Sequence, residues 1–190
     1  MRITGGDLRS RRLIAPRSTA TRPTQDRVRE ALFSILTSRG VFESTPPRAL
    51  DLYAGTGALG LEALSRGAAH CVFVEKARDA LRALDENIRS LGVADRATVL
   101  RVAVDRPLFD APRLAAAGPF DLVFLDPPYA ALAETQALLP ALAARLGPDA
   151  LVVLEHASSD AAGEVPGLSL EDTRIYGDTA LSLFAVSAQT

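Results

Sequence analysis

The segment Asp51-Leu-Tyr-Ala-Gly55-Thr-Gly57-Ala-Leu-Gly60 decides the fold, because it joins an apolar strand to a helix through three glycines. We expect the strand over residues 49–53 and the helix over residues 58–66, where Gly67 ends it. Glycines at this spacing let the backbone turn tightly and let a ligand approach the helix N-terminus closely. The segment therefore predicts the first strand, loop and helix of an α/β domain, although the glycine pattern alone is weak evidence for any one ligand.

The chain on the C-terminal side of this segment alternates strands with helices. We expect strands over residues 71–75, 98–104, 120–125 and 150–155, and helices over residues 77–91 and 132–146. Apolar strands separated by helices indicate a parallel sheet that is covered on both faces. Two final strands, over residues 170–176 and 179–186, flank Gly177-Asp178 and predict an antiparallel hairpin at the sheet edge. The expected fold class is therefore α/β, with a doubly wound, mostly parallel sheet.

The composition excludes several classes of protein. The 190 residues, 48% hydrophobic and 23% charged, fit one globular domain. We expect no membrane partner, because no apolar run approaches the roughly 18 residues of a membrane span, and no secretory signal follows the arginine-rich residues 1–12. Cys71 is the single cysteine, which excludes a disulfide framework, and two histidines are too few for a histidine-rich metal site. We therefore expect no metal and a cytoplasmic location.

The net charge of −2 conceals a basic N-terminal segment. Residues 1–30 contain eight arginines and three acidic residues, a balance of +5, so the remaining 160 residues carry −7. A basic arm on an acidic body indicates a polyanionic partner such as nucleic acid, and a solvated basic surface is the simpler alternative. We expect a β-hairpin ending at Pro16 and a helix from Gln25 to Ser38 capped by Thr24. Residues 1–40 would form a basic, RNA-binding extension of a core over residues 41–190.

Two acidic residues flank the glycine loop. Asp51 lies inside the end of the strand before the loop, and Glu75 ends the next strand. A dinucleotide would direct its pyrophosphate at the helix dipole, whereas an acid before the loop suits a cofactor with a cationic amino group, such as S-adenosylmethionine. Glu75 is placed to accept hydrogen bonds from both ribose hydroxyls. Alternatively, Asp51 caps the glycine loop and Glu75 caps the helix that follows it.

The tetrad Asp126-Pro127-Pro128-Tyr129 follows a strand directly, so we expect it at the carboxyl edge of the sheet, with the glycine loop. The prolines fix the backbone and leave carbonyl groups without competing local N–H bonds. The carboxylate of Asp126 and the carbonyl of Pro127 can then accept both hydrogens of an exocyclic amine, and Tyr129 can stack on the base. A strand-ending turn is the structural alternative.

Together these motifs resemble the class I S-adenosylmethionine-dependent methyltransferases that modify amino nitrogens on planar groups. With Arg22-Pro-Thr-Gln-Asp26-Arg27-Val-Arg29-Glu30 and Tyr176-Gly-Asp-Thr-Ala-Leu-Ser-Leu183, the chain is similar over nearly its whole length to the bacterial 16S rRNA guanine-N2 methyltransferase family. This resemblance implies a Rossmann-like sheet of seven strands, one of them antiparallel. It also implies methylation of the N2 amine of one guanine in 16S rRNA, within an assembled or nearly assembled small ribosomal subunit. We expect the enzyme to be a monomer.

The resemblance assigns three groups of site residues. Catalysis is expected from Asp126, Pro127, Pro128 and Tyr129. S-adenosyl-L-methionine is expected to contact Asp51, Tyr53, Ala54, Gly55, Thr56, Gly57, Gly60, Glu75, Lys76, Ala103 and Asp126. The RNA-binding residues are expected to be Arg9, Arg11, Arg12, Arg22, Thr24, Arg27 and Arg29, with internal ion pairs to Asp26 or Glu30 as the alternative for any arginine of the 22–30 segment.

One position departs from the family pattern. After the third strand the family has Asp-Ala or Asn-Ala, whose polar side chain holds the adenine amine, and this chain has Ala103 there. Asp105 could replace that side chain only if the loop is shifted, so we expect Asp105 to matter little. Among the remaining residues, we expect Cys71 in the core, and His156 at the ligand edge with at most a minor role toward the substrate.

Three other functions fit part of the sequence. A DNA adenine-N6 methyltransferase uses the same tetrad, but 190 residues leave no room for the usual target-recognition domain. A protein glutamine-amide methyltransferase would present a planar amide to the same site, and the basic arm argues against it. A non-catalytic nucleic-acid-binding module with a vestigial pocket would not need Asp51, Glu75, Asp126 and Tyr129 together.

Overall fold

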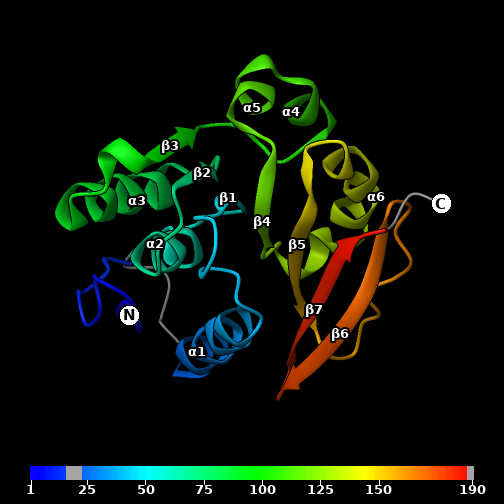
Figure 1. Cartoon of the computed structure of the whole chain (residues 1–190), viewed down its shortest axis with the longest axis horizontal. Helices are drawn as coiled ribbons and strands as arrows, with labels where there is room; N and C mark the ends of the chain where they lie inside the picture. Colours follow the sequence, from blue (N-terminus) through cyan, green and yellow to red (C-terminus); the bar gives the residue numbers. More distant parts are fainter. Residues whose placement is uncertain (16–22, 188–190) are drawn as a thin grey trace. The chain divides into compact units, whose positions relative to one another are not determined.

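The computed structural model describes residues 1–15 and 23–187, other than the side chains of residues 23–25 and 129. The chain forms two compact units, Met1–Val102 and Ala103–Thr190 (Figure 1). The expected division into an extension over residues 1–40 and a core over residues 41–190 stays a prediction. Within the described ranges, no helix combines the length and apolar character that a membrane crossing requires. The same residues include no cluster of three or more His, Cys, Asp or Glu side chains able to hold a metal ion.

The first unit contains a parallel sheet of three strands. β1 (Arg48–Leu52), β2 (His70–Val74) and β3 (Ala97–Leu100) follow the order β3-β2-β1. The first register sets Arg48 opposite His70 and the second sets Cys71 opposite Ala97. Beyond their first residues, β1 and β2 are buried, because packing removes their apolar side chains from water.

Three helices accompany these strands in the first unit. α2 (Ala58–Ser65) contacts β1 and β2 (Figure 1). α3 (Arg78–Leu91) is amphipathic and ends at Gly92, which takes a φ of 72°. A 3-10 turn, η1 (Ala94–Arg96), leads from there into β3. α1 (Pro23–Ser38) begins two residues before the expected Gln25, because proline is well suited to the first helical position.

The expected N-terminal β-hairpin is much smaller in the structure. Arg2 and Arg12 form a single antiparallel bridge. Between them the backbone folds into tight turns, with Ser10 at a φ of 68° and its N–H donating to the Ile3 carbonyl at 2.9 Å. Ile3 and Leu13 are buried, and their side chains anchor residues 1–15, called the arm from here on. The predicted hairpin is therefore present only as this short antiparallel pairing closed by turns, in which the Ile3 N–H donates to the Arg11 carbonyl at 3.0 Å. Its expected end at Pro16 lies outside the described residues.

The second unit contains the other four strands. β4 (Phe120–Leu125), β5 (Leu146–Ala157), β6 (Leu168–Tyr176) and β7 (Thr179–Val186) follow the order β4-β5-β7-β6 (Figure 1). β4 pairs with β5 in parallel, and β7 is antiparallel to both of its neighbours. The expected hairpin around Gly177-Asp178 and the single antiparallel strand are confirmed.

Residues 97–146 also depart from the predicted pattern. The strand expected over residues 98–104 ends at Leu100, and two short helices that we did not predict follow, α4 (Arg106–Asp110) and α5 (Pro112–Ala117). Asp105 begins α4, because its side chain accepts a hydrogen bond from the Leu108 N–H at 3.1 Å. α6 (Leu132–Ala143) ends three residues early because β5 already begins at Leu146.

Candidate active site

The three glycines of the loop after β1 serve different purposes. A Cβ on Gly57 would collide with Leu84, and a Cβ on Gly60 would collide with Phe73, so both positions must be glycine for α2 to pack. A Cβ on Gly55 would meet nothing closer than the Tyr53 carbonyl oxygen at 3.9 Å. Gly55 is therefore the glycine that leaves room for a ligand beside the backbone.

Tyr53 and Ala54, also expected to contact the cofactor, lie in the same loop, whereas Lys76 and Ala103 lie elsewhere in the chain. Tyr53 adopts a φ of 62°, a left-handed conformation that is uncommon for any residue but glycine. The Ala54 N–H donates to the Val74 carbonyl at 3.0 Å, which ties the loop to the end of β2. Lys76 follows that strand and is exposed. Ala103 begins the second unit and is half-buried, and Asp105 is already committed to capping α4.

Asp51 is almost completely buried, with 1% of its surface exposed. Its Oδ2 accepts a hydrogen bond from the Gly60 N–H at 2.9 Å, inside the first turn of α2. The structure thus gives Asp51 the capping role that was the alternative in the sequence analysis. Its contact with a cofactor amine stays a prediction.

Glu75 is half-buried and its carboxylate is held by backbone donors on both sides. Oε2 accepts from the Gly55 N–H at 2.8 Å, and Oε1 accepts from the N–H groups of Lys76 and Ala77 at 2.8 and 2.7 Å. A carboxylate oxygen can accept more than one hydrogen bond. Glu75 therefore joins the ligand-facing glycine to the end of β2 and keeps acceptor capacity for adjacent hydroxyl groups.

A buried asparagine connects the glycine loop to the N-terminal arm. Asn87 of α3 donates from Nδ2 to the carbonyls of Thr56 and Ile14, both at 3.0 Å, and its Oδ1 accepts from the Ile14 N–H at 2.7 Å. The side chain is fully buried, so these bonds are shielded from competing water. Sequence reasoning missed Asn87, which lies in an otherwise ordinary amphipathic helix.

The tetrad in the second unit begins directly after β4. Pro127 is buried and Pro128 is exposed, and the Pro128 carbonyl accepts from the Ala131 N–H at 2.7 Å at the end of η2 (Tyr129–Ala131). The Tyr129 side chain lies outside the described residues. Asp126 reaches solvent, yet the protein around it desolvates the carboxylate and raises its pKa to about 6. Asp126 is therefore a stronger base than an ordinary aspartate.

A second carboxylate accompanies Asp126. β4 and β5 pair Leu125 with Leu154, so Glu155 is the neighbour of Asp126 on the adjacent strand. Desolvation, followed by the charge of Asp126, raises the pKa of Glu155 to about 8. Sequence reasoning missed Glu155. It ends an apolar run as Asp126 does, but only the pairing of β4 with β5 shows that the two acids are neighbours.

His156 has a structural role, in place of the minor substrate role that we considered. It is buried within β5, where Nε2 lies 2.9 Å from the Ser182 hydroxyl and Nδ1 lies 2.9 Å from the Ala157 carbonyl. The Ser182 hydroxyl also lies 3.0 Å from the Thr173 hydroxyl, so these side chains link β5, β7 and β6. Cys71 is buried in β2 as expected, and burial raises the pKa of its thiol, which makes it unreactive.

The structure corrects one of the expected RNA-binding residues. Arg29 is only 5% exposed; Nη2 donates to the Arg2 carbonyl at 2.7 Å and pairs with Asp26 at 3.0 Å. It cannot reach a phosphate, because its guanidinium is used inside the unit. Of the others, Arg9, Arg11, Arg12 and Arg27 are exposed. Arg22 and the side chain of Thr24 lie outside the described residues.

A buried carboxylate anchors the arm to α2. Glu62 is fully buried, and it accepts hydrogen bonds from the N–H groups of Thr4 and Gly5, both at 2.8 Å, and from the Thr4 hydroxyl at 2.7 Å. The Arg66 guanidinium pairs with it at 2.9 Å, and Arg29 lies 3.8 Å away. Glu62 therefore fixes the arm at its first turn, and the Arg66 guanidinium compensates its charge.

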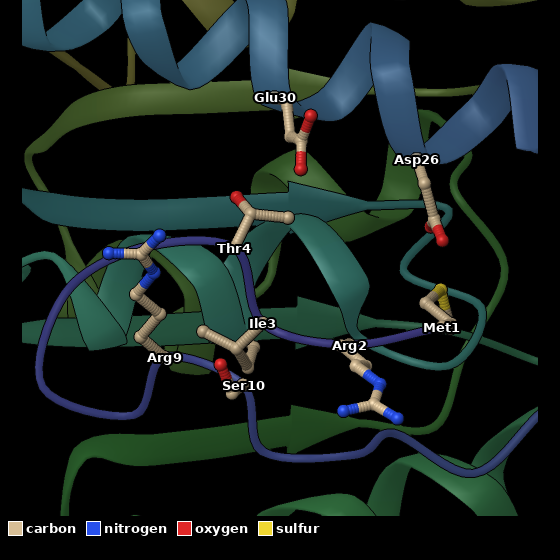
Figure 2. Close-up of a pocket in the computed structure, with 8 residues that line it drawn as sticks. All are labelled: Met1, Arg2, Ile3, Thr4, Arg9, Ser10, Asp26 and Glu30. Atoms are coloured by element: carbon tan, nitrogen blue, oxygen red, sulfur yellow. The ribbon is translucent and has the colours of Figure 1, made fainter.

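A pocket of about 350 Å³ opens between the arm and α1. Figure 2 shows Asp26 and Glu30 pointing from α1 toward the extended segment that carries Arg2, Ile3 and Thr4. The lining is completed by Met1, Arg9 and Ser10. Both signs of charge line this pocket, so its electrostatics favour neither an anion nor a cation.

Comparisons with known proteins agree with this geometry. A family model described as Conserved hypothetical protein 95 matches residues 1–185. The chain belongs to this family. The Ribosomal RNA small subunit methyltransferase D of Escherichia coli K12 is 37% identical over 193 residues, an alignment that covers 100% of this chain and 91% of the relative. The protein of the same name from Haemophilus influenzae is 35% identical over 157 residues, covering 82% and 78%.

Solved structures of similar proteins confirm the fold class. A hypothetical protein from Thermus thermophilus is 36% identical, with a TM-score of 0.79 over 96% of this chain and 98% of that one. An RNA methyltransferase from Salinibacter ruber, solved in complex with S-adenosyl-L-homocysteine, has a TM-score of 0.64 at 20% identity and covers 90% and 96%. The doubly wound, mostly parallel Rossmann-like fold of the class I methyltransferases is therefore confirmed.

Proposed function

We propose that this protein transfers a methyl group from S-adenosylmethionine to the N2 amine of one guanine in the 16S RNA of the small ribosomal subunit. The observation that carries the proposal is the placement of Asp126 directly after β4, ahead of two prolines, with a pKa raised to about 6. The relatives named as ribosomal RNA small subunit methyltransferases support the choice of substrate. We further propose that the enzyme works as a cytoplasmic monomer on an assembled or nearly assembled subunit.

The loop of the first unit suits the proposed cofactor. Gly55 leaves space beside the backbone, and the fixed carboxylate of Glu75 offers acceptors to the two ribose hydroxyls. Asp51 caps this loop, and its negative charge would attract the cationic amino group of the cofactor. When bound, S-adenosylmethionine supplies a methyl group on a sulfonium, which leaves as a neutral thioether. The donors and acceptors of this loop match that molecule better than a pyrophosphate.

The tetrad then acts on the nucleophile. The lone pair of the guanine N2 amine is delocalised into the ring, so the amine is a poor nucleophile until it is held and rehybridised. The Asp126 carboxylate and the Pro127 carbonyl would accept its two hydrogens, which favours positive charge on nitrogen as the bond to carbon forms. Asp126 would take the proton that the methylated amine loses. Tyr129 would stack on the extruded base.

The exposed arginines of the arm would hold RNA phosphates. Arg9, Arg11 and Arg12 are exposed, with Arg11 also donating from Nη2 to the Ser90 carbonyl at 2.6 Å, whereas Arg29 is buried. Replacing all three by glutamate should weaken RNA binding and reduce the salt slope by about 0.7 to 0.9 for each phosphate that is no longer neutralised. Arg113→Glu on α5 is the matched control for charge reversal at one exposed site. An affinity that does not depend on salt in the wild type would contradict an RNA-binding arm.

One experiment separates this proposal from its competitors. The protein is incubated with radiolabelled S-adenosylmethionine and, in parallel, with small ribosomal subunits, naked 16S rRNA, duplex DNA or a glutamine-containing protein extract. The proposal predicts label in N2-methylguanosine at one position and faster labelling of subunits than of naked rRNA. Label in N6-methyladenine or in glutamine would instead identify one of the alternative enzymes, and no cofactor binding would support a non-catalytic module.

A further inference from the structure

Glu155 occupies a position that the reaction described above does not use. Glu155 directly follows Leu154 of β5. Leu154 pairs with Leu125, the last residue of β4, and Asp126 directly follows Leu125. Residues that are in register on parallel neighbouring strands point to the same face of a sheet, on strands about 4.8 Å apart. Two carboxylates therefore stand side by side where β4 ends.

The surroundings of Glu155 do not account for an acid at this place. The next residue, His156, is directed into the interior contact with Ser182. The residue that pairs with Glu155 across the β5–β7 ladder is Leu181, which is apolar and fully buried. The charge that the structure places against Glu155 is that of Asp126, which is repulsive. Two adjacent carboxylates of raised pKa are costly for the fold, and such arrangements are typical of functional sites, where a ligand can supply hydrogen-bond donors.

Guanine offers a matching pair of donors. Its N2 amine and its N1–H are adjacent on the Watson–Crick edge, and enzymes that extrude a base read that edge by hydrogen bonds. Adenine has no hydrogen on N1. With Asp126 and Pro127 holding the amine, the neighbouring carboxylate is positioned for N1–H.

We propose that Glu155 determines base specificity by accepting a hydrogen bond from N1–H of the target guanine, a role that rests on the proposed function. This bond would also offset the desolvation of Glu155, because a donor stabilises the charged carboxylate. Glu155 would contribute to selection of guanine over purines that carry an amine but no N1–H.

The test compares two substrates with three enzymes. Small-subunit RNA is prepared with guanine or with 2-aminopurine, which keeps the N2 amine and lacks N1–H, at the mapped position. For the wild type assayed above about pH 8, where the Glu155 carboxylate is ionised, 2-aminopurine should lower kcat/KM about ten- to a hundredfold, the effect of one hydrogen bond to a charged group. Glu155→Ala should lower kcat/KM for guanine by a similar factor and accept both substrates within about threefold. Asp149→Ala, at the opposite end of β5, should behave as the wild type.

The outcomes are distinguishable from one another. Equal discrimination by Glu155→Ala and wild type would overturn the inference and leave the proposed function intact. A wild type that methylates no guanine amine would overturn both. Glu155→Gln, which keeps the size of the side chain and one acceptor oxygen, should show intermediate discrimination with unchanged cofactor Kd, and it provides the test if Glu155→Ala fails to fold.

Discussion

The carboxylates of Glu62 in the first unit and of Asp126 and Glu155 in the second unit have opposite surroundings. In the first unit, Glu62 is fully buried, accepts three hydrogen bonds from Thr4 and Gly5, and pairs with Arg66. In the second unit, Asp126 and Glu155 are neighbours, and the pKa of each is raised. Donors stabilise the first carboxylate as an anion, whereas desolvation destabilises the other two, and the charge of Asp126 adds to the effect at Glu155.

This difference separates a structural acid from a chemical one. A carboxylate that accepts hydrogen bonds from several segments of the protein holds those segments together. Its removal leaves their donors unpaired. A desolvated pair of carboxylates with raised pKa values costs stability and gains a base suited to a proton transfer near neutral pH. The comparison makes four predictions, given from the largest expected effect to the smallest.

Removing Glu62 should produce the largest loss of stability. Glu62→Ala leaves the guanidinium groups of Arg66 and Arg29 and the donors of the arm without this acceptor, which should cost about 3 to 5 kcal/mol of the free energy of unfolding. Urea unfolding followed by circular dichroism measures this loss. Glu43→Ala, at an exposed site of the same unit, is the control. A loss below about 1 kcal/mol would show that the arm is anchored by other contacts.

Removing Asp126 should leave the fold intact and stop the chemistry. Asp126→Ala should lower kcat by roughly two to three orders of magnitude, since one charge-assisted acceptor contributes about 3 to 4 kcal/mol to the transition state. Single-turnover methylation measures the rate, and Asp149→Ala provides the matched control. An unchanged single-turnover rate would refute the role of Asp126.

Asn87 extends the comparison to a partnered group without charge. Asn87→Ala removes the bonds from a buried side chain to Ile14 and Thr56 and leaves their partly buried backbone groups without this partner, so we expect a loss of about 1 kcal/mol. Hydrogen exchange should show faster exchange at the Ile14 amide. Arg82→Ala, on the exposed side of α3, should change neither quantity.

The smallest expected effect is on how the free energy of unfolding depends on pH. The pKa of Glu155 is raised from 4.5 to about 8 in the fold, so its contribution to stability is present at low pH and is lost as the pH rises through this range. Glu155→Gln should therefore match the wild type near the ordinary pKa of 4.5 and exceed its stability by about 1 kcal/mol once the pH is above about 8, after allowance for solvent screening. Thermal unfolding at the two pH values measures this. A Tm difference that is independent of pH would mean that Glu155 does not titrate as described.

The sequence was sufficient for the periodic elements and for residues at strand ends. The glycine loop, Glu75 and the tetrad were found because their positions depend on chain-local rules for strands, turns and helix termini. Arg29 could not be placed from sequence, because an arginine that binds phosphate and one that pairs with Asp26 follow the same pattern. Asn87 and Glu62 were missed because their main partners lie far away in the chain, where only tertiary packing decides.

Other differences have equally specific causes. The hairpin expected over the arm is short in the structure, where residues 1–3 pair with residues 11–13 and turns fill the rest. The third strand ended early because Asp105 began a helix that apolar periodicity does not signal. Glu155 was overlooked because an acid at a strand end becomes informative only when its neighbour on the next strand is known.

The glycine loop also allows relatives of this protein to be classified by which glycine they have lost. Replacement of Gly57 or Gly60 would disrupt α2 itself, so selection for a folded chain preserves both whether or not the protein still works. A side chain on Gly55 would meet no other side chain, so packing constrains this position less, and its left-handed φ of 54° is the remaining reason for glycine. A homologue that keeps the two packing glycines and has changed Gly55 should therefore keep the packing of α2 and carry strain only in the backbone at that one position.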